Sequence, residues 1–364
     1  MTSPAVHRVP AVLCGVPIAN ATMADAVDAV GDLVELGRSH GRSHQVATVN
    51  VDFLVKATTD SAILALLQEA DLCLADGAPV VWAARALGMP LLERVAGADL
   101  VPAIAERASK TGWRIHLYGS EPGTAERAAE LLIARYPGAD VTGDSGGVLG
   151  DVTNVGDDVI ESIRDRNPDI LCVALGNPKQ EKFIYANRER LNIPVMIGIG
   201  GTLDMLVGSK RRAPLWAQKF GLEWLVRLGQ EPRRLLGRYA LDAWIFPRAI
   251  ARQARLMRRS RVKWGPVIDA QPHEVVIAAT RVADSGAANY AAAIACLEAG
   301  ASLRLDLAES GPFRVADLAA TIGVVRHAEL LGVPVGKGSI GARLQQQCES
   351  LAIDEFLSRV ARIE

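Results

Sequence analysis

The chain has 364 residues, of which 49% are hydrophobic and 22% charged but only 5% aromatic. This length exceeds one average domain, and abundant small aliphatic residues suit α/β layers better than an aromatic-rich β-sandwich. Five widely spaced cysteines without a CxxC pair indicate neither a disulfide framework nor a zinc site, and they fit a cytoplasmic protein. We find no run of about 18 apolar residues and no signal-peptide pattern, so any membrane contact is expected to be peripheral.

The first strand signals lie in the N-terminal third of the chain. Residues 45–55 predict a buried strand running into a helix that continues through Leu67, and residues 70–77 predict a short strand ending in an Asp-Gly turn. Asp76 is thereby placed at the carboxyl end of a strand, where α/β sheets bind ligands and a carboxylate can act as a general base. Asp-Gly is also a common turn dipeptide, so on local sequence a turn residue is the simpler interpretation.

Three further strand-to-loop units follow. Residues 114–120 predict a strand that leads through a Gly-rich turn into a helix over 125–135. Gly119 lies in that turn, whose backbone N–H groups could approach a diphosphate; the turn is neither a P-loop nor a GxGxxG, and a purely structural role is an equal interpretation. Strands are also predicted at 170–176 and 195–201, which completes a pattern of parallel βα crossovers.

A strongly basic helical segment comes next. Between Lys210 and Lys263, fifteen Lys and Arg residues accompany three carboxylates, a local charge of +12 in a chain whose net charge is −1. Amphipathic helical stretches interleave these cations with Trp216, Trp224 and Trp244, which predicts a surface that docks on anionic lipid headgroups. RNA binding and a solvated helical face are the alternatives; no nucleic-acid-binding motif accompanies the charge, so we expect no nucleic-acid partner.

Hydrophobic periodicity resumes after residues 264–273, which are predicted to be a linker. Strands are predicted at 275–279 and 303–307, and helices near 287–299 and at 315–331. This order is similar to STAS domains, the fold of anti-sigma-factor antagonists. The resemblance implies a docking or regulatory module with a protein partner.

Seven short motifs occur in a fixed order between about Val12 and Arg248. They are Thr-Val-Asn (48–50), Ala-Asp-Leu (70–72) with Asp-Gly (76–77), Glu-Arg-Val-Ala-Gly-Ala-Asp (93–99), Gly-Asn-Pro-Lys-Gln-Glu (176–181), Gly-Ile-Gly-Gly (198–201), Arg-Ala-Pro (212–214) and Leu-Glu-Trp-Leu-Val-Arg-Leu (222–228). On these motifs the segment resembles the WecG/TagA/CpsF family of bacterial glycosyltransferases.

The resemblance implies an activity and a role for each matching residue. Members of the family transfer a sugar, commonly N-acetylmannosamine, from a UDP-sugar to an undecaprenyl-diphosphate-linked sugar, with inversion and without a metal or other cofactor. Asp76 would then be the general base, with Thr48 beside it in the pocket. The implied substrate-binding residues are Asn50, Arg94, Gly119, Gln180 and Gly200, and the implied lipid-diphosphate ligands are Arg227, Arg234 and Arg238.

Arginine suits the last of these roles, because its planar fork forms charge-assisted, often bidentate bonds to phosphate oxygens. Two departures from the family pattern concern this region and its neighbour. Arg238 alone precedes Tyr239 where the family often has consecutive arginines, and Phe183 replaces a usual Trp.

We therefore expect a Rossmann-like parallel-sheet α/β glycosyltransferase core over 1–212, a basic helical appendage over 213–263, a linker over 264–273 and a small α/β STAS-like domain over 274–364. The expected substrates are a UDP-sugar and a polyprenyl-diphosphate-linked acceptor, and the expected location is the cytoplasmic face of the cell membrane. A catalytically weak scaffold that recruits partners through the STAS-like domain is the alternative. A dinucleotide-dependent oxidoreductase ranks last, because no GxGxxG follows the first strand.

Overall fold

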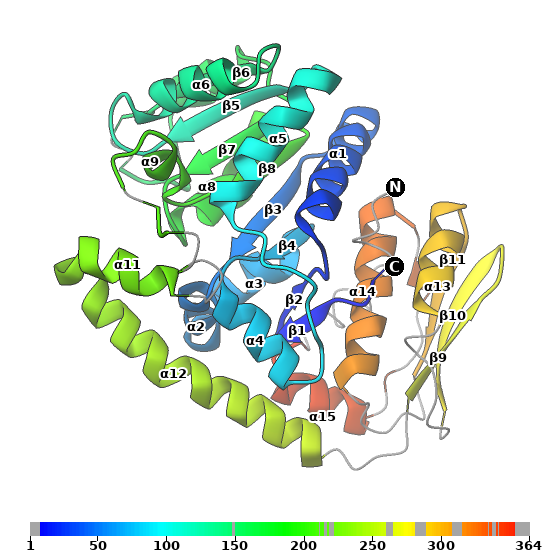
Figure 1. Cartoon of the computed structure of the whole chain (residues 1–364). Coiled ribbons are helices and arrows are strands. Elements are labelled where there is room, and N and C mark those ends of the chain that lie inside the picture. The colour runs from blue at the N-terminus through cyan, green and yellow to red at the C-terminus, as the bar shows by residue number, and fades with distance from the viewer. Residues whose placement is uncertain are drawn as a thin grey trace.

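The computed structural model describes residues 8–147, 150–210, 212–214, 217, 222–259, 265–280, 289–307, 315–333, 335–336, 340 and 342–353. In this part of the chain a parallel sheet with helices on both faces lies above a helical appendage, and a smaller α/β layer lies to one side (Figure 1). The predicted α/β class with a Rossmann-like parallel sheet is confirmed.

The main sheet is parallel throughout and has the strand order β4-β3-β8-β7-β5-β6. Every residue of the four strands at its β4 end is buried, as expected when helices cover both faces. Because all strands run the same way, their carboxyl ends meet at one edge. The strand bounds are β3 (His44–Val49), β4 (Leu72–Ala75), β5 (Arg114–Gly119), β6 (Asp140–Asp144), β7 (Ile170–Ala174) and β8 (Val195–Gly198).

Side chains that alternate along the strands build two separate cores. Leu117, Cys172 and Ile197 pack in one cluster with α1 (Met23–His40), α5 (Gly97–Thr111) and α6 (Thr124–Arg135). Their neighbours Tyr118, Val173 and Met196 pack on the opposite face with α7 (Asp157–Arg164) and α8 (Lys179–Leu191). The sheet is therefore held rigidly from both sides, which fixes the positions of the loops at its carboxyl edge.

One helix predicted as continuous is two helices. The sequence analysis extends the helix after β3 through Leu67, whereas the structure has α2 (Val51–Thr59) and α3 (Ser61–Glu69). Asp60 separates them: it adopts an extended conformation, and its side-chain carboxylate accepts from the backbone N–H groups of Ala62 and Ile63 at 2.9 and 3.4 Å. An Asp that caps a new helix interrupts the old one without breaking the apolar pattern.

A small hairpin precedes the sheet, and two helices form the appendage that follows it. The hairpin strands β1 (Ala11–Leu13) and β2 (Val16–Ile18) are antiparallel, and they pack near β4 and α4 (Ala78–Ala86). The appendage consists of α11 (Glu223–Gln230) and the long α12 (Pro232–Arg259), which packs on α2 and runs toward the C-terminal layer (Figure 1). Among the described residues, none of the helices combines the length and apolar character needed to cross a bilayer.

The C-terminal layer has the elements that the sequence predicts. Its sheet has the order β12-β11-β10-β9, in which β9 is antiparallel to β10 and the other pairs are parallel. The bounds are β9 (Gly265–Ala270), β10 (Glu274–Thr280), α13 (Tyr290–Glu298), β11 (Ser302–Asp306), α14 (Val315–Leu331), β12 (Val335–Gly336) and α15 (Ala342–Ser350). Whether this layer is a STAS domain, and where one domain ends and the next begins, stay predictions.

The predicted linker over 264–273 differs from the structure, because β9 occupies most of it. Gln271 donates its backbone N–H to the carbonyl of Glu274 at 3.0 Å, which closes a tight turn between β9 and β10. β9 is the last strand of its sheet, so Pro266 is tolerated there, and this proline makes the segment read as a linker in the sequence.

The C-terminal layer shares a hydrophobic core with the N-terminal hairpin. Leu13 and Val16 of the hairpin belong to the same buried cluster as Val275, Leu303 and Leu318 of the C-terminal layer. Polar contacts join the same parts: the buried Gln68 side-chain amide donates to the carbonyls of Gly15 and Ala352 at 2.9 and 2.8 Å. The C-terminal layer is thus packed onto the core and not tethered beside it.

Candidate active site

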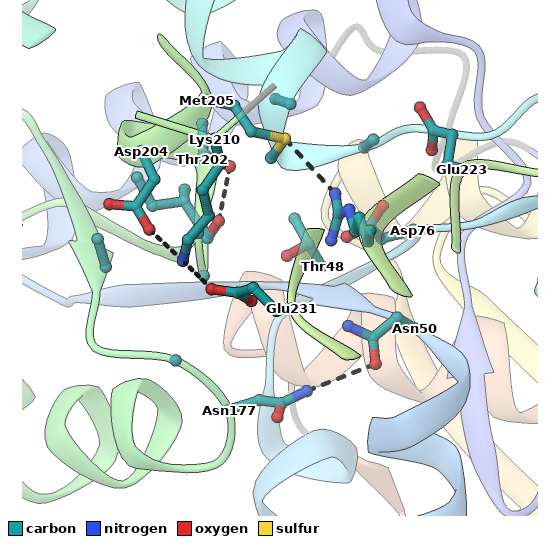
Figure 2. Close-up of a pocket in the computed structure, with 18 of the residues that line it drawn as sticks. Thr48, Asn50, Asp76, Asn177, Thr202, Asp204, Met205, Lys210, Glu223 and Glu231 are labelled. Carbon is teal, nitrogen blue, oxygen red and sulfur yellow. Dashed lines mark hydrogen bonds and ion pairs between the residues drawn. The ribbon is translucent and has the colours of Figure 1, made fainter. Parts of the chain in front are cut away.

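The carboxyl edge of the main sheet opens into a pocket of about 420 Å³. Its floor comes from the loops after β3, β4, β5, β7 and β8, and the appendage forms its far wall (Figure 2). Of the residues predicted for the site, seven line this pocket: Thr48, Asn50, Asp76, Gln180, Gly200, Arg227 and Arg238.

Asp76 follows β4 directly, and its backbone N–H donates to the carbonyl of Val49 at 2.8 Å, which ties the loop to the neighbouring strand. Gly77 follows with φ +123°, a conformation that favours glycine, and turns the chain sharply into α4. Burial raises the pKa of the Asp76 carboxyl, while the charges of Arg227 and Arg94 act in the opposite direction. A carboxylate with an elevated pKa in a pocket has the properties of a general base.

Thr48 and Asn50 flank Asp76 from the end of β3, and each has a structural hydrogen bond. The Thr48 hydroxyl donates to the carbonyl of Gly198 at 2.8 Å, which links β3 to β8. Asn50 caps α2, since its side-chain oxygen accepts from the backbone N–H of Phe53 at 3.0 Å. The Asn177 side-chain amide donates to the same Asn50 oxygen at 3.4 Å, so the cap also holds the loop after β7 (Figure 2).

Gln180 lines the pocket and has a buried partner. Its side-chain carbonyl accepts from the backbone N–H of Gly200 at 2.8 Å, and its amide N–H donates to the Glu181 carboxyl at 2.7 Å. Gly198 makes this possible, because a Cβ there would lie 2.5 Å from the Gln180 nitrogen. Glu181 is fully buried, and burial raises its pKa to about 7. Gln180 therefore shapes the 198–201 loop, with Glu181 fixing its orientation.

The Gly119 turn presents its neighbour to the pocket. Gly119 has φ +97° and lies against Ala174 and Leu175, whereas Ser120 and not Gly119 lines the cavity. The Ser120 hydroxyl donates to the Asp204 carboxylate at 2.7 Å. These contacts do not test the diphosphate-binding role of Gly119, which stays a prediction. The turn that contains Gly119 does reach the pocket.

Arg94 does not line the pocket, although the sequence analysis places it on the sugar nucleotide. Its two terminal nitrogens donate to the carboxylates of Glu223 and Asp99, at 2.7 and 3.1 Å. Asp99 also pairs with Arg212. The Arg94 side chain, which the sequence motifs place on the substrate, thus joins the core to the appendage through these two contacts.

The appendage arginines lie at different depths. Arg227 lines the pocket and approaches the Met205 sulfur at 3.6 Å. Arg238 also lines it and lies 3.9 Å from the Asp52 carboxylate. Arg234 belongs to α12, but its side chain lies outside the described residues.

Sequence reasoning missed an ion-pair bridge at the pocket. Lys210 lies 2.6 Å from the Asp204 carboxylate and 3.6 Å from that of Glu231, which joins the loop after α9 (Thr202–Leu206) to the appendage (Figure 2). The signal available in the sequence was that Glu223 and Glu231 are two of only three carboxylates in the basic segment. Among the described residues, no group of three or more His, Cys, Asp or Glu side chains could hold a metal ion.

Comparison with known proteins extends this description. The pattern of the Glycosyl transferase WecG/TagA/CpsF family matches residues 11–261. An N-acetylglucosaminyldiphosphoundecaprenol N-acetyl-beta-D-mannosaminyltransferase of Bacillus spizizenii is 33% identical over 189 residues, which cover 52% of this chain and 72% of the relative. A protein of the same name from Staphylococcus aureus is 31% identical over 217 residues, 59% of this chain and 83% of the relative.

Proposed function

Because the chain belongs to the WecG/TagA/CpsF glycosyl transferase family, we propose that it is a hexosyltransferase that acts on a polyprenyl-diphosphate-linked sugar in the synthesis of a cell-surface polymer. The observation that carries the proposal is Asp76, a carboxylate of raised pKa at a strand end, in a pocket whose far wall supplies arginines. The names of the relatives favour N-acetylmannosamine as the transferred sugar. A UDP-sugar suits the pocket as the donor, because the pocket is large enough for a nucleotide-sized ligand.

In the proposed reaction Asp76 accepts the proton of the acceptor hydroxyl as the hydroxyl oxygen attacks the anomeric carbon of the donor. The bond from that carbon to the UDP oxygen breaks, and its electron pair leaves with UDP. Attack from the face opposite the leaving group inverts the anomeric centre. Thr48 and Asn50, both hydrogen-bonded to the scaffold, support the floor beside Asp76.

In this proposal, cationic side chains neutralise the negative charge of the phosphate groups. Arg227 and Arg238 line the pocket and have the planar fork that suits phosphate oxygens, and Arg234 lies between them on the appendage. These arginines would hold the diphosphate of the lipid acceptor, as the family resemblance implies. Cationic side chains and backbone N–H groups would stabilise the charge that develops on the leaving UDP, so we expect turnover without a divalent ion.

The acceptor's lipid calls for contact with a membrane, and the appendage has the side chains for it. Exposed apolar residues on α11 and α12 accompany exposed arginines, as in helices that lie in a bilayer interface. Trp224 is 41% exposed and Trp244 63%, and the Arg248 guanidinium lies 3.2 Å from the centre of the Trp244 ring. We therefore assign the protein to the cytoplasmic face of the membrane, held by the appendage.

The test is turnover by the purified full chain with a panel of UDP-sugars and a synthetic diphosphate-lipid acceptor, with and without EDTA. We expect one donor to be consumed and the product to have the inverted anomeric configuration, with activity unchanged by EDTA. Absence of turnover with every donor would contradict the proposed transfer. Loss of activity in EDTA that magnesium restores would contradict only the metal-independent mechanism.

A further inference from the structure

We propose that Arg94 is a positioning residue that docks the appendage: its ion pair with Glu223 holds α11 against the core and thereby fixes Arg227 beside Asp76. The inference rests on the proposed glycosyltransferase function and assigns Arg94 a different part in it from substrate binding. It explains why a motif arginine that does not itself line the pocket donates to a glutamate 129 residues further along the chain.

Each terminal nitrogen of the Arg94 guanidinium donates to a carboxylate. One terminal nitrogen donates to Glu223 on the appendage at 2.7 Å, and the other donates to Asp99 on α5 at 3.1 Å. The side chains of Arg94 and Glu223 are only 19% and 21% exposed, so solvent screens this pair less than it screens a surface pair. Asp99 belongs to α5, which packs in the core. Its contact with Arg94 therefore ties Arg94, and through Arg94 also Glu223, to the core.

The appendage gains from such a contact because α11 lies on the core through side chains that are at least partly exposed. None of its residues, from Glu223 to Gln230, is buried. Apolar burial, which normally fixes a helix on a core, therefore contributes little here. The contacts described for this end of the appendage are polar or lie at its edge: Arg227 approaches the Met205 sulfur at 3.6 Å, Glu231 just after the helix meets Lys210 at 3.6 Å, and Trp224 meets the ring of Tyr239 edge-on at 6.1 Å.

The spacing along α11 connects the ion pair to the site. Glu223 and Arg227 are four residues apart, so they lie on the same face of the helix, one turn from each other. Holding Glu223 against Arg94 directs Arg227 into the pocket, where its charge reaches Asp76. Loss of the ion pair would leave Arg227 chemically intact but no longer fixed at the reacting groups.

A double-mutant cycle in two backgrounds tests the proposal with the full chain. We expect Arg94→Ala and Glu223→Ala each to lower kcat/KM for the lipid acceptor on the order of 10²-fold, the scale of a misplaced active-site group. The double variant should lose no more than either single variant, because both remove one ion pair. In an Arg227→Ala background, neither substitution should have a further effect. Arg94→Lys should be intermediate, since a single ammonium cannot bridge both carboxylates as the fork does.

UDP affinity, measured by calorimetry, separates this role from substrate binding. We expect the UDP affinity of both single variants to stay within about twofold of the wild-type value, because effects at independent sites usually add to within that margin. Arg94→Ala that weakens UDP binding while Glu223→Ala does not, or losses that add in the double variant, would overturn the proposal. The matched control is the exposed pair Arg127 and Glu130 on α6, whose double Ala variant should behave as wild type.

Hydrogen exchange of the α11 amides provides a readout that does not depend on turnover. Both single variants should exchange faster over residues 223–230, while the control pair should leave that rate unchanged. If wild type fails to turn over any donor, the proposed function fails, and the exchange rates alone decide the docking role. Unchanged exchange in both single variants would overturn it.

Discussion

At the residue scale, the floor of the pocket places Asp76, whose pKa is raised by burial, beside Thr48 and Asn50. Asp76, Thr48 and Asn50 were found because strand ends of a parallel sheet converge, and a short motif marks each end. The contact of Arg94 with Glu223 could not be predicted, because Glu223 is distant in the chain and a motif does not show which side chains an arginine meets.

Glu181 illustrates a second kind of limit. It belongs to the same motif as Gln180, but only the packing shows that it is fully buried against Gly198. Burial raises its pKa to about 7, from an ordinary value of 4.5. Between these two pH values the unfolded chain releases this proton and the folded chain retains it. Stability is therefore lost as pH rises through this window.

We accordingly predict that Glu181→Gln removes part of the pH dependence of stability. The loss in the wild type between about pH 4.5 and 7 should approach roughly 3 kcal/mol from this residue alone. Urea unfolding at pH 5 and pH 8 measures it. The variant should lose less stability than wild type between those two values, whereas Glu130→Gln, an exposed control on α6, should match wild type. Equal losses in wild type and Glu181→Gln would contradict the buried, protonated state.

At the element scale, periodicity predicted β3, β4, β5, β7 and β8 of the main sheet and the helical segments after β3 and β5, but not the hairpin β1–β2 or the helices α1 and α5. Two further differences have local causes. The Asp60 cap divided one predicted helix, and the turn closed by Gln271 made a strand of the predicted linker. The amphipathic appendage was predicted from its Trp and Arg residues, but its docking was not. The docking of the appendage depends on the ion pairs of Lys210 and Arg94 with their carboxylate partners, and local sequence patterns do not reveal such pairs.

The appendage also carries the prediction on membrane binding. Trp224→Ala with Trp244→Ala should weaken co-sedimentation with anionic vesicles, because both side chains are exposed and aromatic rings favour the bilayer interface. High salt should weaken binding of the wild type as well, since each interfacial Arg contributes on the order of 1 kcal/mol that salt screens.

A matched control for this experiment lies on α8. Tyr185 is 41% exposed, and the Arg188 guanidinium lies 4.9 Å from its ring centre, a pairing similar to that of Trp244 with Arg248. Tyr185→Ala should sediment as wild type does. If it reduced sedimentation as much as the double Trp variant, the appendage would not be the docking surface.

At the scale of the whole molecule, the sequence predicted β10, α13, β11 and α14 of the C-terminal layer, but not β9, β12 or α15, and it treated that layer as a separate module. The structure packs it on the N-terminal hairpin through one shared buried cluster. Contacts between the two ends of a chain are invisible to local patterns, and the apolar residues at this junction look like ordinary core residues of each part.

This junction predicts that the C-terminal layer stabilises the core. Gly323 on α14 lies so close to Pro10 and Tyr290 that a Cβ would come within 2.9 Å of the proline and 2.6 Å of the tyrosine hydroxyl. Gly323→Leu should force α14 away from Pro10, which directly precedes β1, and from Tyr290 on α13, and it should lower the melting temperature of the full chain, by several degrees for a loss of roughly 1–3 kcal/mol, the range for overpacking. Gly332 has a positive φ, so Gly332→Leu would strain the backbone and is an unsuitable control. Gly229 on α11 has open space around it, and Gly229→Leu should leave the melting temperature unchanged. An unchanged melting temperature in Gly323→Leu would show that the layer is separable.

The most direct test of the proposed glycosyltransfer is turnover by Asp76→Asn, measured beside its affinity for UDP. A general base acts on the acceptor hydroxyl and not on the nucleotide, so turnover should fall by roughly 10²–10⁴ while UDP binding stays near that of wild type. Glu121→Gln, which alters another carboxylate lining the same pocket, should keep most of the activity. An Asp76→Asn variant that retained more than about a tenth of wild-type turnover, outside the range for loss of a general base, would contradict the role of Asp76.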